Sequence, residues 1–595
     1  MVSGKRKQGR PKARWLDTIK SDMGMNIKQL KEAMKNREVW VNKHETFYWI
    51  IHQEKQILVT CLIFIILPPC CHILSERAPP VTHRSPFISI WNAPTEVCTR
   101  KQKINIDLRL FQFTGNPMKT STNQSITLFY YDRLGHYPYI NEDTGETFHG
   151  GIPQLIPLYN HFKKAEEDIS FYIPSEKQLG FAVIDWENWR PLWIRNWATK
   201  DIYRKQSVEF VQQKDLTLTQ RRAHAIAKIE FEAAAQRVML DTLWLGKSLR
   251  PNHFWGYFLF PDCYNYDYKQ HSHNYTGSCP EIELKRNDEL MWLWKESTAL
   301  YPNIYLETAL KSSKNAALFV RNRIKEAMRT SKLANITSPL PIYAYARPVF
   351  TDMPHKYLSE VDLVHTLGES AAMGISGFIM WGDLSLAQTM KTCTNLNNYL
   401  KDVLNPYIIN VTLAAKMCSH VLCQNKGTCT RKNWNTSDYL HLNPQNILIQ
   451  QTKEGSYLVT GQPAVEDLQQ FTERFNCLCY AGHRCKPTID IQHIGHIQVC
   501  MTVDICVTAT FYPTLNPRTK DTTLKTFLPH TEAAIDISTA KAIKYRDTYI
   551  IDIMSKRKMN GMQKLVFRDA EISVHPAILQ YKEDCLQCAK SYQSW

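Results

Sequence analysis

The chain has 595 residues, of which 44% are hydrophobic and 11% are aromatic. This composition is that of a folded protein with one large domain and smaller modules, and it excludes a largely disordered chain. The formal net charge of +16 favours an acidic partner, which is a nucleic acid, an anionic membrane or a polyanionic sugar. No zinc-finger spacing or Walker loop occurs in the sequence, and the basic residues are spread along it, so a solvated basic surface is the alternative.

The first 76 residues differ from the rest of the chain. Residues 1–50 are basic, polar and helix-prone, and residues 9–23 resemble the tail of retrotransposon-encoded reverse transcriptases. We interpret this extension as an insertion or gene-prediction artefact, with a nucleic-acid-binding arm as the alternative. Residues 51–76 contain an apolar run at 57–67 that is too short to span a membrane but typical of a signal peptide. We expect cleavage near residues 74–78.

Residues 77–410 show apolar, strand-like runs that alternate with helical stretches. Strand-like runs lie at 126–131, 181–184, 253–260, 304–306, 340–345 and 377–381, and helical patterns at 219–247 and 314–331. This order predicts a parallel α/β barrel, with a doubly wound open sheet as the alternative. In such a barrel the C-terminal strand ends meet at one face, so the polar residues there would converge on one cleft. They are Asp185, Glu187, Asp262, Tyr305, Glu307, Arg347, Trp381 and Asp383.

An acidic pair, Asp185 and Glu187, follows the buried run 181–184. Side chains alternate along a strand, so both carboxyl groups point to one side, roughly 7 Å apart. Two neighbouring carboxylates cannot both ionise at low cost, so one pKa rises and that group can act as an acid near neutral pH. Trp186 and Trp189 interleave with the acids, an arrangement typical of glycosidases. The alternative is an acid pair that caps a helix or binds an arginine.

Cysteines and sequons indicate an oxidising, secretory compartment. The chain has 17 cysteines and five Asn-x-Ser/Thr sequons, at which we expect glycosylation. The sequons are at Asn123, Asn274, Asn335, Asn410 and Asn435.

Residues 411–486 contain six cysteines with C-x4-C-x5-C and C-x-C-x5-C spacing. This pattern resembles an epidermal-growth-factor (EGF)-like module with a long insertion. Six cysteines allow fifteen pairings. The expected set is Cys418–Cys429, Cys423–Cys477 and Cys479–Cys485, and zinc ligation is the alternative.

Residues 487–595 are expected to form a polar, irregular tail. Within it, Cys500 and Cys506 are predicted to close a small disulfide loop. Cys585 and Cys588 form a C-x-x-C motif with no thioredoxin-like pattern around it, and we assign it no role. We find no hydrophobic segment near the C-terminus, so we expect neither a lipid-anchor signal nor a second membrane span.

Several motifs occur together: Ile-Asp-Trp-Glu-Asn-Trp-Arg-Pro at 184–191, Trp-Gly-Tyr-Phe-Leu-Phe-Pro-Asp-Cys-Tyr-Asn at 255–265, Ala-Leu-Tyr-Pro-Asn-Ile-Tyr at 299–305 and Gly-Phe-Ile-Met-Trp at 377–381. They resemble the animal hyaluronidase family of glycoside hydrolases, and most closely its sperm-surface members. The resemblance covers roughly residues 75–510. It implies a distorted TIM-like (β/α) barrel followed by the disulfide-rich EGF-like module, in a secreted or cell-surface protein of the sperm surface or acrosome.

The resemblance further implies an endo-glycosidase that hydrolyses β-1,4 bonds after N-acetylglucosamine in hyaluronan, with some action on chondroitin. The implied mechanism is retaining and substrate-assisted. Glu187 would protonate the leaving oxygen and then activate water, while the acetamido oxygen of the substrate attacks the anomeric carbon. Asp185 would orient the acetamido nitrogen, and its charge would help to keep Glu187 protonated.

Other positions take their expected roles from the same resemblance. Tyr305 and Trp381 would line the acetamido pocket, and Arg323 would lie at the cleft. Asp262 and Tyr264 would contact the sugar beside them. The implied barrel disulfides are Cys98–Cys393 and Cys263–Cys279. We expect a monomer that associates with hyaluronan, and at most with a membrane surface, and that uses no nucleic acid, metal or other cofactor.

One position departs from the family pattern. The family has two tyrosines in Trp-Gly-Tyr-Tyr, and the second of them, a cleft residue, is Phe258 here. The loss of one hydrogen bond to substrate costs on the order of 1 kcal/mol. An alternative function is therefore a weakly active or inactive hyaluronan-binding or adhesion protein. A nucleic-acid-associated protein, based on the basic first 45 residues, is a third hypothesis.

Overall fold

The computed structural model describes residues 76–82, 85–335, 337–453, 455–485, 495–511, 541–545 and 548–552. The basic extension, the signal-like segment before residue 76 and the C-x-x-C motif at Cys585 and Cys588 lie outside these residues. The chain divides into two units, Met1–Thr514 and Leu515–Trp595. In the second unit, the described residues form one antiparallel hairpin of β17 (Lys541–Tyr545) and β18 (Thr548–Asp552).

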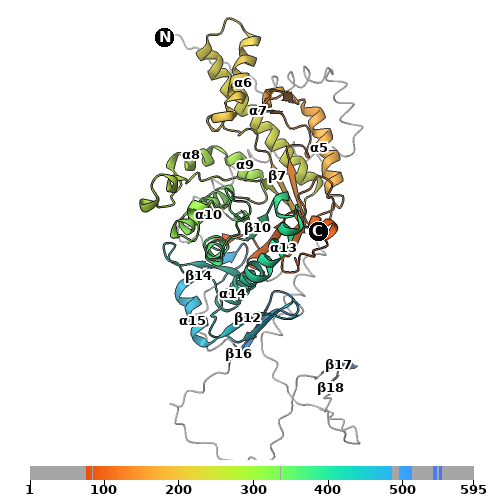
Figure 1. The fold of residues 1–595 in the computed structure, drawn as a ribbon, viewed down its shortest axis with the longest axis vertical. Helices are drawn as coiled ribbons and strands as arrows, with labels where there is room; N and C mark the ends of the chain where they lie inside the picture. Colours follow the sequence, from red (N-terminus) through yellow and green to blue (C-terminus); the bar gives the residue numbers. More distant parts are fainter. Residues whose placement is uncertain are drawn as a thin grey trace, which may run out of the picture. The chain divides into compact units, whose positions relative to one another are not determined.

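Parallel strands form two sheets in the first unit, with helices around them (Figure 1). The first sheet has the order β3 (Phe113–Gly115), β2 (Ile88–Asn92), β10 (Gly377–Trp381) and β9 (Tyr343–Ala346). The second has the order β4 (Ile126–Tyr130), β7 (Gly180–Asp185) and β8 (His253–Tyr257). Every pairing within both sheets is parallel, as expected when helices connect successive strands.

Two irregular junctions join the sheets into a closed ring. Residues 300–303 form isolated parallel bridges to both neighbours: Tyr301 to Phe258, Leu300 to Ile342, and Asn303 to Tyr345. At the other junction Ser125 Oγ donates a hydrogen bond to the Thr114 carbonyl oxygen at 2.7 Å. The strands then follow one another around the ring in chain order, which is the arrangement of a distorted (β/α) barrel. The doubly wound open sheet is thereby excluded.

Helices cover the outside of the ring. They are α4 (Glu96–Gln102), α5 (Leu158–Tyr172), α6 (Asp201–Lys214), α7 (Gln220–Leu249), α8 (Glu281–Glu289), α9 (Met291–Glu296), α10 (Lys314–Ala334), α11 (Glu360–Leu363), α12 (Glu369–Ala372) and α13 (Met390–Tyr399). Helix α10 shows why they pack there: Ala316, Val320, Ile324 and Ala327 recur every three or four residues and are buried. Helices α6 and α7 lie side by side at the top of Figure 1.

The strand side chains sort into two apolar layers. Phe181 and Val183 of β7 belong to a cluster inside the ring, whereas Ala182 and Ile184 belong to the layer between ring and helices. The other strands alternate in the same way, because successive side chains point to opposite faces. The inner cluster includes Ile88, Ile90, Ile126, Leu128, Tyr301, Tyr345 and Ile379.

Helix α14 (Asn405–Cys423) leads from the barrel into the cysteine-rich region. The expected boundary between residues 410 and 411 falls inside this helix. The region beyond it contains β11 (Gly427–Arg431), β12 (Ile447–Gln451), β13 (Tyr457–Gly461), α15 (Val465–Arg474) and β14 (Phe475–Tyr480). Strand β14 pairs with β11 and also with β1 (Glu76–Arg77), so residues that precede the barrel complete this small sheet.

The expectation of an irregular tail after residue 487 is wrong for residues 496–510. There β15 (His496–Cys500) and β16 (Cys506–Thr510) form an antiparallel hairpin. Ile497, Val499, Val507 and Ala509 are buried at alternating positions, so a short period-two pattern buries one face. The hairpin is attached to α14, where Lys416 Nζ donates a hydrogen bond to the Cys500 carbonyl oxygen at 2.7 Å.

Six disulfides connect the described residues, and they are the six pairs named from the sequence. Two lie in the barrel, three in the cysteine-rich region and one in the β15–β16 hairpin. They are Cys98–Cys393, Cys263–Cys279, Cys418–Cys429, Cys423–Cys477, Cys479–Cys485 and Cys500–Cys506.

Candidate active site at the mouth of the barrel

Side chains alternate between the two faces of each strand, and the inward-facing positions at the C-terminal strand ends carry the site residues. Asp185 continues the inward positions of β7, and Tyr130 and Trp381 do the same at the ends of β4 and β10. Arg347 follows β9 at the next inward position after Tyr345. Strands far apart in the sequence thus place an acid, a cation and aromatic rings at one opening.

The acidic pair has one buried and one exposed member. The Asp185 Oδ1 atom is buried and has no hydrogen-bond partner among the described residues. Burial raises the pKa of Asp185 well above its usual value, and the charge of Glu187 and a hydrogen bond with its carboxyl group raise it further. The side chain of Glu187 is 47% exposed. This shift favours the protonated form of the Asp185 carboxyl group.

Two cations hold the segment that carries Glu187. Arg190 donates to the Glu187 carbonyl oxygen at 2.8 Å and to its Oε2 atom at 2.9 Å. Lys200 Nζ donates to the same carbonyl at 2.7 Å and to that of Asn188 at 3.0 Å, and it lies 3.6 Å from Glu142 Oε1. Sequence reasoning assigned no role to either cation. For Arg190 the available signal was its position three residues after Glu187; Lys200 had none.

Tyr305 and Trp381 come together as expected from the sequence. Their rings are stacked with centroids 6.0 Å apart and an angle of 18° between the planes. The Arg347 guanidinium lies 5.0 Å from the Trp381 ring and 5.8 Å from the Tyr305 ring, and it forms an ion pair of 2.8 Å with Asp383. Burial raises the pKa of Tyr305 well above its usual value, and nearby Asp185 adds to the effect. Its hydroxyl group therefore stays protonated and can donate a hydrogen bond.

Phe258 lies directly beside this aromatic pair. It is 9% exposed, and its ring centroid is 6.0 Å from Tyr305 and 4.9 Å from Tyr345. Its aromatic neighbours are tyrosines, so a hydroxyl group at this position would enter a site that already contains phenolic groups. The substitution thus removes polarity from the site and leaves the aromatic packing in place.

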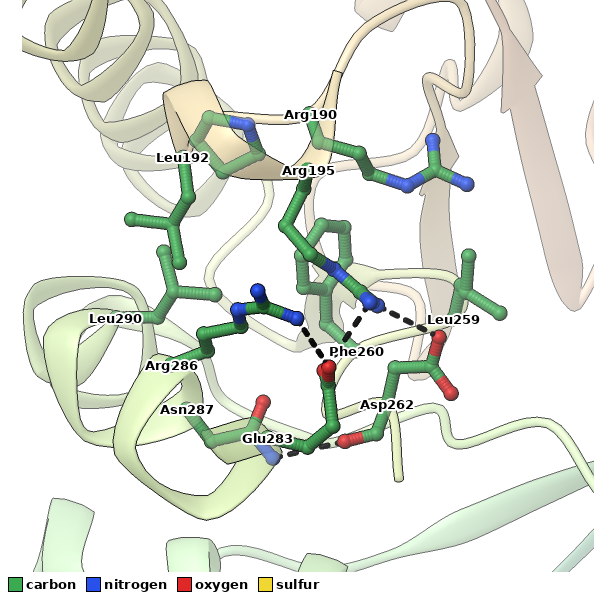
Figure 2. Close-up of a pocket in the computed structure, with 11 residues that line it drawn as sticks. Arg190, Leu192, Arg195, Leu259, Phe260, Asp262, Glu283, Arg286, Asn287 and Leu290 are labelled. Carbon is green, nitrogen blue, oxygen red and sulfur yellow. Dashed lines mark hydrogen bonds and ion pairs between the residues drawn. The ribbon is translucent and has the colours of Figure 1, made fainter. Parts of the chain in front are cut away.

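Asp262 forms a separate charged cluster after β8 (Figure 2). It makes an ion pair with Arg195 at 3.0 Å. It also pairs with Arg323 at 3.3 Å and accepts hydrogen bonds from the backbone N–H groups of Cys263 and Tyr264. Burial opposes ionisation of Asp262, but the two arginines and these N–H groups outweigh it and hold the pKa below its usual value. The adjacent cavity has a volume of about 20 Å³, which is the room of about one water molecule. It cannot accept a sugar ring.

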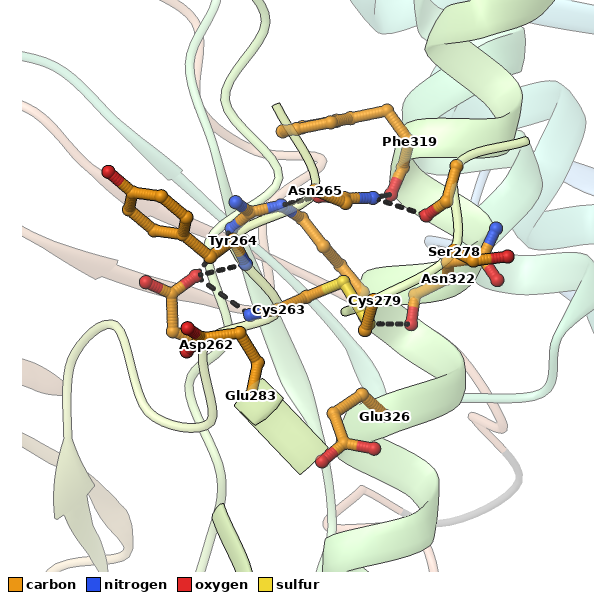
Figure 3. Close-up of a disulfide and its surroundings, with 12 residues drawn as sticks. Asp262, Cys263, Tyr264, Asn265, Ser278, Cys279, Glu283, Phe319, Asn322 and Glu326 are labelled. Atoms are coloured by element: carbon orange, nitrogen blue, oxygen red, sulfur yellow. Dashed lines mark hydrogen bonds and ion pairs between the residues drawn. A yellow bond between two sulfur atoms is a disulfide. The ribbon is translucent and has the colours of Figure 1, made fainter. Parts of the chain in front are cut away.

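Three residues of this cluster were expected at the substrate site, Asp262, Tyr264 and Arg323. The Arg323 side chain is only 2% exposed and donates to Asn265 Oδ1 and to the Asn303 carbonyl oxygen. It lies beneath Asp262 and not on an open cleft, which corrects the expected placement. Tyr264 is 36% exposed and follows Cys263, whose disulfide to Cys279 fixes this loop (Figure 3). Of the cluster, Tyr264 is the residue that remains accessible to a ligand.

The described residues contain no group of three or more His, Cys, Asp or Glu side chains that could hold a metal ion. Within the same ranges, no helix is long and apolar enough to cross a membrane. Four sequon asparagines are exposed: Asn123, Asn274, Asn335 and Asn435. Asn410 is half-buried on α14, where its Oδ1 atom accepts the backbone N–H of Leu442 at 2.8 Å.

Comparison with known proteins places this site in a family. A family model described as hyaluronidase matches residues 76–489. Hyaluronidase PH-20 of Homo sapiens is 53% identical over 456 residues, which are 76% of this chain and 89% of that protein. Hyaluronidase-5 of Mus musculus is 52% identical over 465 residues, which are 78% and 87% of the two chains.

Among solved structures, bee venom hyaluronidase in complex with a hyaluronic acid tetramer is 30% identical, with a TM-score of 0.49, and covers 54% of this chain and 98% of that chain. The family model matches well over half of the chain, and the two mammalian relatives are about half identical to it over most of their length. The chain therefore belongs to the hyaluronidase family and is a glycosidase.

Proposed function

We propose that this protein hydrolyses the β-1,4 bonds between N-acetylglucosamine and glucuronate in hyaluronan, and those of chondroitin to a smaller extent, by a retaining, substrate-assisted mechanism. The observation that carries the proposal is the Asp185–Glu187 pair beside the stacked rings of Tyr305 and Trp381. An acid pair that shares a proton, next to an aromatic wall, fits a sugar with a neighbouring acetamido group.

Substrate binding starts the proton movement. When the acetamido N–H donates a hydrogen bond to Asp185, it stabilises the ionised form of that carboxyl group. The proton of the pair then moves to Glu187, whose side chain is the exposed member. Arg190 holds the Oε2 atom of Glu187 and fixes the orientation of the carboxyl group. In this proposal the carboxyl pair thus supplies the proton that Glu187 uses.

Bond cleavage then proceeds in two steps. Glu187 donates its proton to the leaving oxygen while the acetamido oxygen attacks the anomeric carbon, which gives an oxazolinium-type intermediate. The negative charge of Asp185 stabilises the positive acetamido nitrogen. Glu187 next removes a proton from water, whose oxygen attacks the anomeric carbon and reopens the ring. Two displacements on the same carbon retain its configuration.

The other parts of the molecule suit an extracellular monomer. Six disulfides require an oxidising compartment. We infer that residues 411–486 are an EGF-like module, supported by its three disulfides and the antiparallel pairing of β11 with β14. The five sequons are proposed glycosylation sites of a secreted or cell-surface protein. The barrel mouth is built from strands of one chain, which supports function as a monomer.

A second candidate function is hyaluronan binding with little turnover. Phe258 favours it, because the ring beside Tyr305 carries no hydroxyl group. In this case the barrel mouth would bind the polysaccharide and release it unchanged.

Depolymerisation of hyaluronan by the full chain separates the two candidates. Glu187→Gln should lower the rate at least a hundredfold, because general acid–base catalysis contributes about 10²- to 10⁴-fold. Glu281→Gln, at a carboxyl group 80% exposed on α8, is the matched control and should depolymerise hyaluronan at the parental rate. A parent protein that binds hyaluronan without cleaving it would support the binding function instead.

A further inference from the structure

We propose that Lys200 is a positioning residue for Glu187 and that Glu142 is its charge partner. This inference rests on the proposed role of Glu187 as the acid and base. Lys200 does not need to touch the substrate for this role: it acts through the backbone of the segment that carries Glu187.

The lysine ammonium group reaches two consecutive carbonyl groups of that segment. Its Nζ atom is 2.7 Å from the Glu187 carbonyl oxygen and 3.0 Å from that of Asn188. The third neighbour is Glu142 Oε1 at 3.6 Å, in the turn between β5 (Tyr139–Ile140) and β6 (Thr147–Phe148). Two of the three N–H groups of the ammonium are therefore donated to backbone carbonyls, and the ion pair with Glu142 lies on its remaining side.

Lys200 is held there at a cost in free energy. Its side chain is only 27% exposed, and burial lowers its pKa, as does the nearby positive charge of Arg190. Two residues earlier, Ala198 has a φ of 55°, a left-handed conformation that is unfavourable for a residue with a Cβ atom. A strained backbone and a buried cation beside another cation are features that cluster at functional sites.

The segment needs this support because Glu187 lies beyond the end of β7. Strand β7 ends at Asp185, so the sheet does not fix the backbone of Glu187. Its carbonyl oxygen accepts hydrogen bonds from Arg190 and Lys200 in place of a neighbouring strand. A general acid must lie within hydrogen-bond reach of the leaving oxygen, and a misplacement of about 1 Å costs roughly a hundredfold in rate.

Lys200 also balances the charges around it. The positive charge of Arg190 lowers the pKa of Lys200, whereas the negative charges of Glu142 and Glu187 raise it. Glu142 partly neutralises Lys200. Removal of the lysine ammonium group should therefore leave Glu142 without this ion-pair partner and take one hydrogen-bond donor from each of the two carbonyl groups.

The test compares Lys200→Met, Lys200→Arg and Glu142→Gln in the full chain. Lys247→Met is the matched control. Lys247 lies on α7, is 25% exposed like Lys200, and forms an ion pair of 2.6 Å with Glu296 of α9. We expect Lys200→Met to lower kcat on hyaluronan about 10- to 100-fold with KM changed less than about threefold. Lys200→Arg should restore most of kcat. The kcat of Glu142→Gln should lie between those of Lys200→Met and the parent, and the kcat of Lys247→Met should equal that of the parent.

Amide hydrogen exchange of residues 186–192 gives a readout that does not require turnover. We expect exchange there to be at least about tenfold faster in Lys200→Met than in the parent or in Lys247→Met. Exchange could be faster in Lys200→Met while the parent does not cleave hyaluronan. That result would support the positioning role of Lys200 and reject the proposed hydrolytic function. Parental kcat and parental exchange in folded Lys200→Met would overturn the inference. If Lys200→Met does not fold, unchanged kinetics and exchange in Glu142→Gln would overturn it.

Discussion

Trp381 and Tyr130 are 251 residues apart in the chain, yet Trp381 Nε1 donates a hydrogen bond to the Tyr130 hydroxyl oxygen at 3.1 Å. Strands β10 and β4 are not neighbours in the ring, so this bond crosses the mouth of the barrel. Tyr130 is also the register partner of Asp185 on β7. One phenolic group therefore connects the aromatic wall of the site to the strand that carries the acid.

Tyr130→Phe removes the acceptor and leaves the ring. The loss of one hydrogen bond, worth about 1 kcal/mol, should lower kcat/KM on hyaluronan about fivefold because Trp381 is no longer fixed against Tyr305. Steady-state kinetics check this, with Tyr159→Phe as the control because Tyr159 is 56% exposed on α5. An unchanged kcat/KM in Tyr130→Phe would show that the bond does not contribute to the site.

Phe258→Tyr should raise kcat/KM on hyaluronan about fivefold, because a restored hydroxyl group gains a hydrogen bond of about 1 kcal/mol in the complex. Tyr345 Oη is buried without a hydrogen-bond partner among the described residues, and its ring contacts Phe258, so a partner is available before substrate binds. Phe171→Tyr, at a ring 58% exposed on α5, is the control. A lower kcat/KM at parental thermal stability would contradict this prediction.

Stability should decrease as the pH falls from about 6.5 to 4. Burial lowers the pKa of His161 and His253 to about 4, so below pH 6.5 the unfolded chain binds protons that the folded chain does not. Each histidine therefore costs about 2 kcal/mol at pH 5, and the cost is complete below the folded pKa.

Urea unfolding at pH 7.5 and pH 5 measures this effect. His161→Gln should reduce the loss of stability between the two values by about 2 kcal/mol. His273→Gln, at an exposed position, should leave the loss unchanged. Equal pH dependence in the parent and in His161→Gln would show that the buried histidine is not the cause.

The features that could be predicted from the sequence are those that one segment carries. The apolar run before Asp185 and the alternation rule place both acids at a strand end, and the structure shows that end inside the barrel mouth. The motif of residues 299–305 brought Tyr305 into the predicted site, although its segment forms only isolated bridges. These predictions depend on local pattern and motif.

Features that depend on long-range contacts could not be predicted from a single sequence. Tyr130 ends an ordinary strand pattern, and its role arises from its contact with Trp381. Lys200 lies 13 residues after Glu187, and nothing in its sequence neighbourhood indicates their contact. Arg323 was expected at an open cleft because motif position does not specify burial. The β15–β16 hairpin was missed because its pattern is short and interrupted by a disulfide loop.

The most direct test of the account measures whether the substrate supplies its own nucleophile. Hyaluronan oligosaccharides with N-acetyl, N-fluoroacetyl, N-difluoroacetyl and N-trifluoroacetyl groups carry progressively weaker acetamido nucleophiles. If the acetamido oxygen attacks the anomeric carbon while Asp185 stabilises the acetamido nitrogen and Glu187 transfers the proton, kcat/KM should fall steeply along the series. The expected total decrease is about a thousandfold or more. A kcat/KM that stays nearly constant across the four substrates would contradict substrate assistance and require another nucleophile.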